Sequence, residues 1–135
     1  MSEQDNIQVV KDLYAAFGGG DFATMLDFWV DDLVYYVPGP PDILPWAGTL
    51  QGKAELRQWY EMVEKTLEFD FFEPQQYLAN GETVVVLGTE RYRVKNTDKV
   101  IDNDFAYVYT VRNGKIVKCH EHNDSAAQVA VMQRA

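Results

Sequence analysis

The first part of the chain has apolar residues at helical spacing. A capping box of Asp5 and Gln8 would open a first helix, and the glycines from Gly18 to Gly20 would end it. One face of this helix is apolar because the following residues fall three or four positions apart: Ile7, Val10, Leu13, Tyr14 and Phe17. The pattern predicts an amphipathic helix that packs against a core.

Two further helices are predicted before the character of the sequence changes. Asp21 can cap a short second helix that carries Phe22, Met25, Leu26 and Trp29, and a strand is expected from Leu33 to Val37. Four prolines then predict a non-helical loop over residues 38–52. A third helix is expected from Lys53 to Thr66, with one apolar side that includes Trp59 and Tyr60.

The second half of the chain reads as β-structure. Four strands are predicted here: Phe69–Ala79, Thr83–Val94, Val100–Val111 and Ile116–Asn123. Turns are predicted between them at Asn80-Gly81, Asn96–Asp98 and Asn113-Gly114. The tail from Ser125 to Ala135 is either a short helix or frayed. Helices followed by an antiparallel meander indicate an α+β fold, in which a curved sheet wraps around three N-terminal helices as a cone-shaped barrel. Such a cone leaves a space for a small molecule at its open end.

The turn at Asn113-Gly114 decides which side chains of the last strand point into this space. A two-residue turn would place Tyr107 opposite His120, whereas a bulged turn would place Phe105 opposite Glu121. The bulged register separates apolar from polar residues more cleanly, so it is the preferred prediction. In that register Glu121, Asn123, Cys119, Tyr107 and Phe105 point inward, with Val117 beside them.

The preceding strand supplies a second inward acid. Arg91 and Arg93 belong on the outer face more readily than Tyr92 does, which turns Glu90 inward. Two carboxylates in an apolar space raise each other's pKa and can produce a general base near neutral pH. Glu90 at a sheet edge, or Glu121 at a strand end, can also be a solvated or paired acid without a role in chemistry.

Each of the other candidate site residues has a structural interpretation as well as a functional one. Trp46 in the proline-rich loop is either a lid over the pocket or an anchor for the loop, and Trp59, Tyr60 and Tyr92 are pocket wall or core. His120 and His122 alternate along a strand as metal ligands sometimes do, but the chosen register puts them on the outer face beside Lys118. No metal site is therefore predicted.

Composition narrows the function classes. A chain of 135 residues suits one domain, predicted to span residues 1–135. Its 12 basic and 21 acidic residues give a formal charge of −9, which argues against nucleic-acid or membrane-surface partners. The single cysteine, Cys119, excludes an internal disulfide and reads as a buried filler rather than a nucleophile. The absence of a signal-like start and of a long apolar run predicts a cytoplasmic protein.

The residues in three segments resemble a known family. Segments 12–39 (DLYAAFGGGDFATMLDFWVDDLVYYVPG), 44–60 (LPWAGTLQGKAELRQWY) and 105–127 (FAYVYTVRNGKIVKCHEHNDSAA) are similar to the SnoaL-like polyketide cyclases and ketosteroid isomerases of the nuclear-transport-factor-two-like superfamily. The resemblance implies a cone-shaped α+β barrel with an apolar cavity, usually a homodimer joined through the outer face of the sheet. It also supports the inward placement of Tyr107 and Glu121.

The resemblance carries over only in part. In the polyketide cyclases a histidine and an acidic base fall at Tyr107 and Glu121, so the base would be kept and the histidine replaced. In the isomerases the helical tyrosine falls at or beside Leu13, next to Tyr14, and the catalytic aspartate falls on Val37, which cannot take a proton. An epoxide hydrolase of the superfamily would need an inward arginine, which is not predicted here. Asp124 matches a frequent aspartate of SnoaL-like sequences, and it is either a helix cap or a second acid of the site.

Together these observations predict an enzyme without cofactor that acts on a small, largely apolar organic molecule. Glu121 would accept a proton and Tyr107 would donate a hydrogen bond to the oxyanion, in an isomerase, cyclase or lyase type of reaction, with Asp124 as the third catalytic candidate. The competing hypothesis is a non-catalytic binding or dimerisation module of the same fold. The residues expected to line the cavity and contact substrate are Trp46, Trp59, Tyr60, Glu90, Tyr92, Phe105, Cys119 and Asn123.

Overall fold

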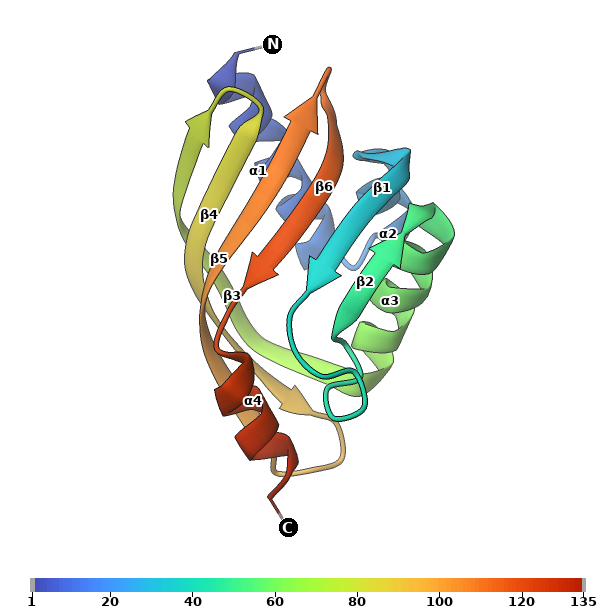
Figure 1. Cartoon of the computed structure of the whole chain (residues 1–135), viewed down its shortest axis with the longest axis vertical. Helices are drawn as coiled ribbons and strands as arrows, with labels where there is room; N and C mark the ends of the chain where they lie inside the picture. The colour runs from blue at the N-terminus through green and yellow to red at the C-terminus, as the bar shows by residue number, and fades with distance from the viewer. Residues whose placement is uncertain (1, 135) are drawn as a thin grey trace.

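The computed structural model describes residues 2–134 as one curved sheet with helices behind it and below it (Figure 1). The helices are α1 (Glu3–Gly18), α2 (Phe22–Asp27), α3 (Gly52–Thr66) and α4 (Ser125–Met132). The strands are β1 (Trp29–Val37), β2 (Gly48–Gln51), β3 (Leu67–Asn80), β4 (Thr83–Val94), β5 (Val100–Arg112) and β6 (Lys115–His122). The α+β class predicted from the sequence is confirmed.

The sheet is curved but not closed into a barrel. Its strand order is β2-β1-β6-β5-β4-β3, so β2 and β3 are free edges. All neighbouring strands are antiparallel except β1 and β6, which run parallel. Because strands twist and the long strands β3 to β5 bend, the inner face becomes concave. Helices α1, α2 and α3 cover the concave side, and α1 lies behind the sheet in the view of Figure 1.

The helices begin where side chains can accept hydrogen bonds from free backbone amides. Helix α1 is capped by Ser2, whose side chain accepts from the Asp5 amide while the Asp5 carboxylate accepts from the Ser2 amide. The predicted capping box with Gln8 is therefore wrong, because Asp5 occupies the third helical position rather than the cap. Asp21 caps α2 as predicted, and its carboxylate accepts from the Thr24 amide at 3.1 Å.

The segment after α2 differs from the prediction. Helix α2 ends at Asp27, and the chain is already in strand β1 at Trp29, which is 1% exposed. Asp31 and Asp32 lie inside this strand as exposed residues. The loop predicted over residues 38–52 also contains the short edge strand β2, which pairs with the end of β1. Strands β3 to β6 follow the predicted elements to within two residues at each end. In the predicted tail, residues Ser125–Met132 form helix α4; Ala135, the last residue of that tail, lies outside the described residues.

The hairpin between β5 and β6 combines two features that the sequence offered as alternatives. Asn113 and Gly114 both have positive φ, at 52° and 79°, and form a two-residue turn in which Val111 pairs with Ile116. The register then shifts, so that Tyr107 pairs with Glu121 and Tyr109 with Cys119. The predicted bulge at Gly114 is wrong, since the extra residue is Val117, three positions further on, and the predicted pairing of Phe105 with Glu121 is wrong for the same reason.

Although the bulge is displaced, most residues of β6 point to the side of the sheet that was predicted for them. Glu121 and Cys119 are buried on the inner side, whereas Lys118 and His122 are exposed. Only the two residues next to the turn exchange places. Ile116 is fully buried and Val117 is half-buried, contrary to the prediction that Val117 would point inward.

The core lies between the concave face of the sheet and the three N-terminal helices. It is built from the inward residues of the strands and from the apolar faces of α1 and α3, including Val10, Leu56 and Trp29. Gly88 on β4 illustrates how close this packing is, because a Cβ at this position would lie 2.4 Å from the Glu73 carbonyl oxygen and 2.6 Å from the Phe105 ring. Among the described residues, no helix is long and apolar enough to cross a membrane.

Candidate active site

A cavity of about 720 Å³ opens inside the cone and is mostly aromatic. Its wall contains side chains from α1, α2, α3, the loop before β2, and the inner face of the sheet. The aromatic residues that line it are Tyr14, Phe17, Phe22, Trp29, Tyr35, Trp46, Trp59, Tyr60, Phe69, Phe71, Phe72, Tyr92, Tyr107 and Tyr109. A cavity of this size and lining fits a small organic molecule.

Glu121 enters the cavity from β6 and is held by a phenol of the neighbouring strand. It is 6% exposed, and its Oε2 atom accepts a short hydrogen bond from the Tyr35 hydroxyl. Tyr35 lies opposite Cys119 in the parallel β1–β6 pair, two residues before Glu121, so its ring can reach along the strand to the carboxylate. Strand alternation thus brings a base and a hydrogen-bond donor to the same surface.

Glu90 enters the same cavity from β4. It is 4% exposed, and its Oε2 atom accepts a hydrogen bond of 2.6 Å from the Tyr107 hydroxyl. Tyr107 itself pairs directly with Glu121 across the β5–β6 ladder. The inner face therefore carries two carboxylates, each bonded to a phenol, with Tyr107 between them.

Burial shifts the proton affinity of both acids. Removal from water, followed by the nearby Glu90 carboxylate, raises the pKa of Glu121 to about 8, although the hydrogen bond from Tyr35 and the nearby Tyr107 hydroxyl oppose the rise. Burial raises the pKa of Glu90 to about 7, against the opposing effect of the hydrogen bond from Tyr107 and of the nearby Asn103 amide. With these pKa values, both acids populate the protonated and the ionised form near neutral pH, as general acid–base catalysis requires.

A second pair of phenols lies deeper, towards α1. The Tyr14 and Tyr109 hydroxyls are 2.8 Å apart, and burial raises the pKa of both well above the usual value for tyrosine. Both residues line the cavity, as does Leu13 beside Tyr14. These hydroxyls stay protonated at any ordinary pH and can serve as hydrogen-bond donors.

The lower end of the cavity is closed by a network around Gln128 of α4. Its Oε1 atom accepts from the Trp46 indole at 2.8 Å and from the Tyr92 hydroxyl at 3.2 Å. Its Nε2 atom donates to Asn123 at 2.8 Å and to Asn103 at 3.4 Å. Trp46 is also fixed through its carbonyl, which accepts from the Trp59 indole at 2.8 Å. Trp46 is thus an anchored part of the wall rather than a free lid.

Most of the residues predicted from the sequence meet at this cavity. Those that line it are Glu121, Tyr107, Glu90, Trp46, Trp59, Tyr60, Tyr92 and Asn123. Arg91 and Arg93 lie on the outer side, where they pair with Asp102 and Asp70. The space is therefore free of arginine among the described residues, as the sequence suggested.

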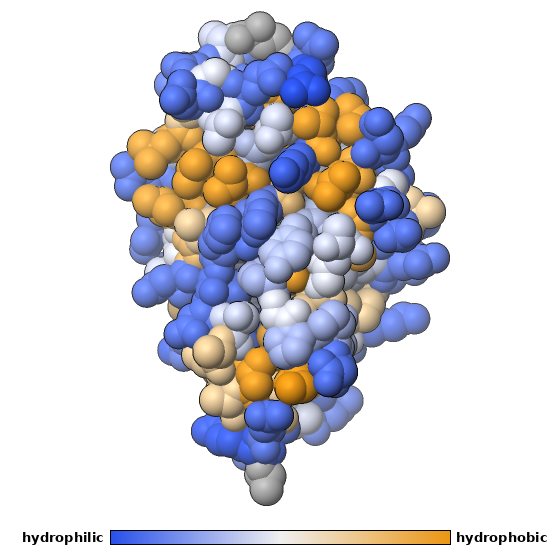
Figure 2. All heavy atoms as spheres, in the orientation of Figure 1, coloured by the Kyte–Doolittle hydropathy of each residue, from blue (hydrophilic) through white to orange (hydrophobic). Residues whose placement is uncertain are grey.

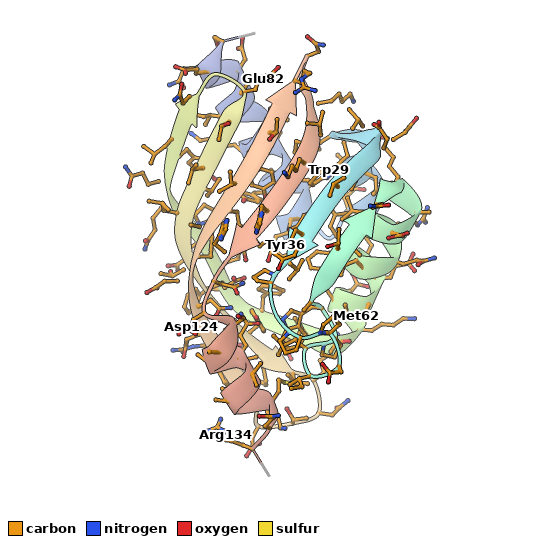
Figure 3. All side chains as sticks on the ribbon, in the orientation of Figure 1. Trp29, Tyr36, Met62, Glu82, Asp124 and Arg134 are labelled. Carbon is orange, nitrogen blue, oxygen red and sulfur yellow. The ribbon has the colours of Figure 1, made fainter. Side chains whose placement is uncertain are left out.

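Asp124 does not belong to the site. Its exposed carboxylate accepts from the Ala127 amide at 2.9 Å and caps α4, at the junction of β6 and α4 (Figure 3). It is not among the residues that line the cavity. Of the two predicted roles for Asp124, helix cap or second acid of the site, the structure therefore supports the helix cap.

Phe105 and Cys119 are also placed behind the wall rather than in it. The Phe105 ring stacks on Tyr107, with ring centroids 4.2 Å apart, and on Phe72 at 5.2 Å. Cys119 is fully buried, and burial raises the pKa of its thiol well above the usual value. Neither residue lines the cavity, so both support the inner face without reaching a substrate.

The histidines lie on the opposite side of the sheet. The rings of His120 and His122 stack with centroids 4.3 Å apart, and His120 also contacts the Tyr36 ring at 4.4 Å. Within residues 2–134, no group of three or more His, Cys, Asp or Glu side chains is arranged to hold a metal ion.

Three site residues were not found by the sequence reasoning. Tyr35 alternates with the buried Leu33 and Val37, so the period of β1 alone could have turned it inward. Asn103 follows the same parity as Phe105 and Tyr107 on β5. Gln128 carried no such signal, because its partners come from three other segments of the chain.

Comparisons with known proteins agree with this geometry. The chain is 34% identical to an NTF2-like protein from Burkholderia xenovorans LB400, over 98% of this chain and 99% of that chain, with a TM-score of 0.89. An NTF2-like protein from Burkholderia pseudomallei K96243 is 26% identical over 99% and 100% of the two chains, with a TM-score of 0.84. TerC, crystallised with polyporic acid, has the same fold at 22% identity, with a TM-score of 0.82 over 96% and 99% of the chains.

The family itself is shown by a match to a sequence model. Among curated proteins, no match was found. The model of the SnoaL-like domain matches residues 10–119, which include most of the cavity wall and the strands β3 to β5. This protein therefore belongs to the SnoaL-like family.

Proposed function

We propose that this protein is an enzyme that works without a cofactor and moves a proton on a small, largely apolar organic molecule. The observation that carries the proposal is Glu121, a carboxyl group that is buried in an aromatic cavity, has a pKa of about 8 and is oriented by Tyr35. The reaction would be an isomerisation, a cyclisation or an elimination that begins with removal of a proton from carbon.

In this proposal Glu121 is the general base. Its carboxylate takes the proton from a carbon next to a carbonyl group, and the electrons of the C–H bond pass to the carbonyl oxygen. The hydrogen bond from Tyr35 keeps one oxygen of the carboxylate occupied, which leaves the other to face the substrate.

The oxyanion would be stabilised by Tyr107. Its hydroxyl proton is donated to Glu90 in the structure. When Glu90 holds a proton, which its pKa of about 7 allows, Glu90 can donate to the Tyr107 oxygen and the Tyr107 hydroxyl can turn towards the substrate. Glu90 would thus act through Tyr107 as a positioning residue.

The test is hydrogen–deuterium exchange of small neutral ketones, for example 2-tetralone and 1-indanone, in D₂O followed by NMR. The protein should accelerate exchange at the carbon beside the carbonyl. The rate should pass through a maximum between about pH 7 and pH 8, because Glu121 must be ionised while Glu90 still holds its proton. Glu121→Gln should lower the rate at least about 100-fold and abolish this pH dependence. Glu68→Gln, which changes an exposed acid on β3, is the matched control.

A non-catalytic binding module is the second candidate, favoured by Val37. This residue is buried and does not line the cavity, so the aspartate that the isomerases are expected to have here has no counterpart. A protein that binds ligands in the cavity but leaves the exchange rate of every ketone in the panel unchanged would support this candidate and contradict the enzyme.

We further propose that the chain forms a homodimer through the outer face of its sheet. Apart from the resemblance, support comes from the half-buried apolar side chains on this face, such as Val85, Leu87 and Val108. Figure 2 shows the outer face as apolar patches separated by polar residues. Light scattering should give twice the chain mass of 15.5 kDa, and a monomer at micromolar concentration would contradict the dimer.

A further inference from the structure

The charged side chains of the cavity are unbalanced. Glu90 and Glu121 are buried in it, and the only other charged residues that line it are Lys11 and Glu64, both exposed. The wall thus has three acids and one base, and within the described residues no buried cation faces the two buried acids. The whole chain carries a formal charge of −9, which adds to the negative potential.

Each buried acid has one oxygen that is free to bind a ligand. Hydrogen bonds from the described residues reach Oε2 of Glu121 and Oε2 of Glu90. Neither Oε1 atom has such a partner, and neither is fully buried as are the unpaired Asn6 amide oxygen and Trp29 indole nitrogen. Two side chains that are more than nine-tenths buried thus present an unpaired carboxylate oxygen to an empty space.

The rest of the wall is suited to a cation because it consists of aromatic faces. Tyr35 and Trp59 pack with centroids 5.2 Å apart beside Glu121, and Trp59 also contacts Tyr60 at 5.9 Å. Phe72 and Tyr107 stack at 6.5 Å beside Glu90. Aromatic faces attract positive charge through their quadrupole, and they do so more strongly in a desolvated site.

We propose that the ligand of this cavity is a small organic cation, an aromatic or alicyclic molecule with a protonated amine or a quaternary ammonium group that lies between the Glu90 and Glu121 carboxylates. This inference rests on the proposed function only for the identity of the binding site. The ammonium group would hold the ligand in place by binding to the two carboxylates. The positive charge would also acidify a neighbouring C–H bond, which favours removal of a proton by Glu121.

An organic cation fits better than its alternatives. A metal ion prefers several hard ligands, and the described residues offer no group of three or more such side chains at one place. An anionic ligand would meet two carboxylates in a low-dielectric space, where repulsion is strong. A neutral ligand without a hydrogen-bond donor would leave the unpaired carboxylate oxygens unsatisfied.

A cation should also change the protonation of the site. Both acids hold a proton more firmly than usual because burial disfavours their charged forms, and a bound positive charge would reverse this effect. The other titratable groups that face the two acids do not release protons near pH 7, because burial raises the pKa of each of them above its usual value. They are Tyr35 on β1, Tyr92 on β4, Tyr107 and Tyr109 on β5, Tyr14 on α1, Tyr60 on α3 and Cys119 on β6. Binding of a permanent cation at pH 7 should therefore release protons from the two glutamates.

The experiment compares three unreactive probes of similar size: phenyltrimethylammonium, its neutral carbon isostere tert-butylbenzene, and benzoate. Binding is followed by the fluorescence of the cavity tryptophans Trp29, Trp46 and Trp59 at pH 8. The cation should bind at least about tenfold more tightly than the isostere, and benzoate should not bind. Calorimetry of the cation at pH 7, in buffers of different ionisation enthalpy, should show proton release.

Variants test whether Glu90 and Glu121 cause the preference for the cation over its neutral isostere. Glu90→Gln and Glu121→Gln should each weaken the cation about tenfold or more while leaving the isostere within about twofold, and Glu68→Gln should change neither. Binding of the isostere also proves that each variant is folded with its cavity intact. A cation that binds no better than tert-butylbenzene, or equally well to all variants, would overturn the inference. Ketone exchange is measured with neutral substrates, so its result decides the proposed function separately.

Discussion

The two faces of the same strands carry opposite chemistry. On the inner face, β4, β5 and β6 present Glu90, Tyr107 and Glu121, all less than 10% exposed. On the outer face, the neighbouring residues Arg91 and His122 are exposed, and His120 is half-buried against Tyr36. A residue and its neighbour therefore meet environments that push their pKa values in different directions: burial raises the pKa of Glu121, and burial with nearby positive charge lowers that of His120.

This contrast shows that residue type alone is a poor guide to a site. Histidine pairs are common in catalysis and metal binding, yet here they stack on each other away from the cavity. Glutamate is usually a surface residue, yet both acids of the inner face line an aromatic cavity. The difference arises because alternate residues of a strand point to opposite faces of the sheet. The changes below test this assignment of faces.

The largest effect is expected from a change that reverses parity. Insertion of one alanine after Cys119 would move Glu121 to the outer face and a histidine to the inner face, which should unfold the protein or lower its stability by more than about 4 kcal/mol. Deletion of Val117 is the matched control, because it removes the bulge and leaves Cys119 and Glu121 facing inward. Thermal unfolding followed by circular dichroism measures both. Equal stability of the insertion variant and the wild type would contradict the assignment of faces.

The second effect is a fall in stability with rising pH. Glu90 and Glu121 have raised pKa values in the folded state, so the folded protein holds protons that the unfolded chain has lost. Stability should therefore be greatest near pH 4.5 and decrease by several kcal/mol up to about pH 8, after which it levels off. Urea unfolding from pH 5 to pH 9 measures this slope.

Glutamine at both positions should remove most of the slope. The double variant Glu90→Gln and Glu121→Gln should be more stable than the wild type at pH 9, because two buried charges are gone. Glu68→Gln should keep the original slope, since Glu68 is exposed. An unchanged slope in the double variant would mean that other groups cause the pH dependence.

The third effect compares adjacent tyrosines of β1. Tyr35→Phe removes the hydrogen bond to Glu121, which should raise the pKa of that acid by roughly one further unit and lower stability by about 1 kcal/mol. Tyr36→Phe changes the neighbouring residue on the outer face, where the side chain is 37% exposed, and should leave the pKa of Glu121 unchanged. NMR titration of ¹³C-labelled glutamate carboxyls separates the two outcomes, and equal shifts in both variants would contradict the Tyr35 contact.

The smallest effect is expected on the outer face. The pKa of His120 is lowered in the folded state, so its contribution to stability is present above about pH 6.5 and is lost as the pH falls below that value. His120→Gln should therefore reduce the loss of stability on the acid side, by no more than about 0.5 kcal/mol, and leave ligand binding unchanged. Urea unfolding at pH 5.5 and pH 7.5 measures this difference. A large loss of ligand binding would contradict the separation of the two faces.

Most of the elements, though not β2 or the start of β1, and most of the strand faces could be predicted from the sequence. Hydrophobic period located α1, α3 and the four long strands, and charge placed Arg91 and Arg93 outside, which turned Glu90 inward. These features depend on local periodicity and on the cost of burying an unpaired charge, both of which can be read from neighbouring residues. The same reasoning predicted that Glu121 and Tyr107 share one face.

How that face becomes a site depends on contacts between segments that are distant in the sequence. The position of the bulge depends on the twist of a two-residue turn and on pairing with β1, so local patterns allowed two alternative registers, and neither matches the whole hairpin. The bond between Tyr35 and Glu121 spans 86 residues of sequence, and the contacts of Gln128 join α4 to three other segments. Local periodicity sets which side a residue faces, but the partners it meets there depend on how distant strands and helices come together.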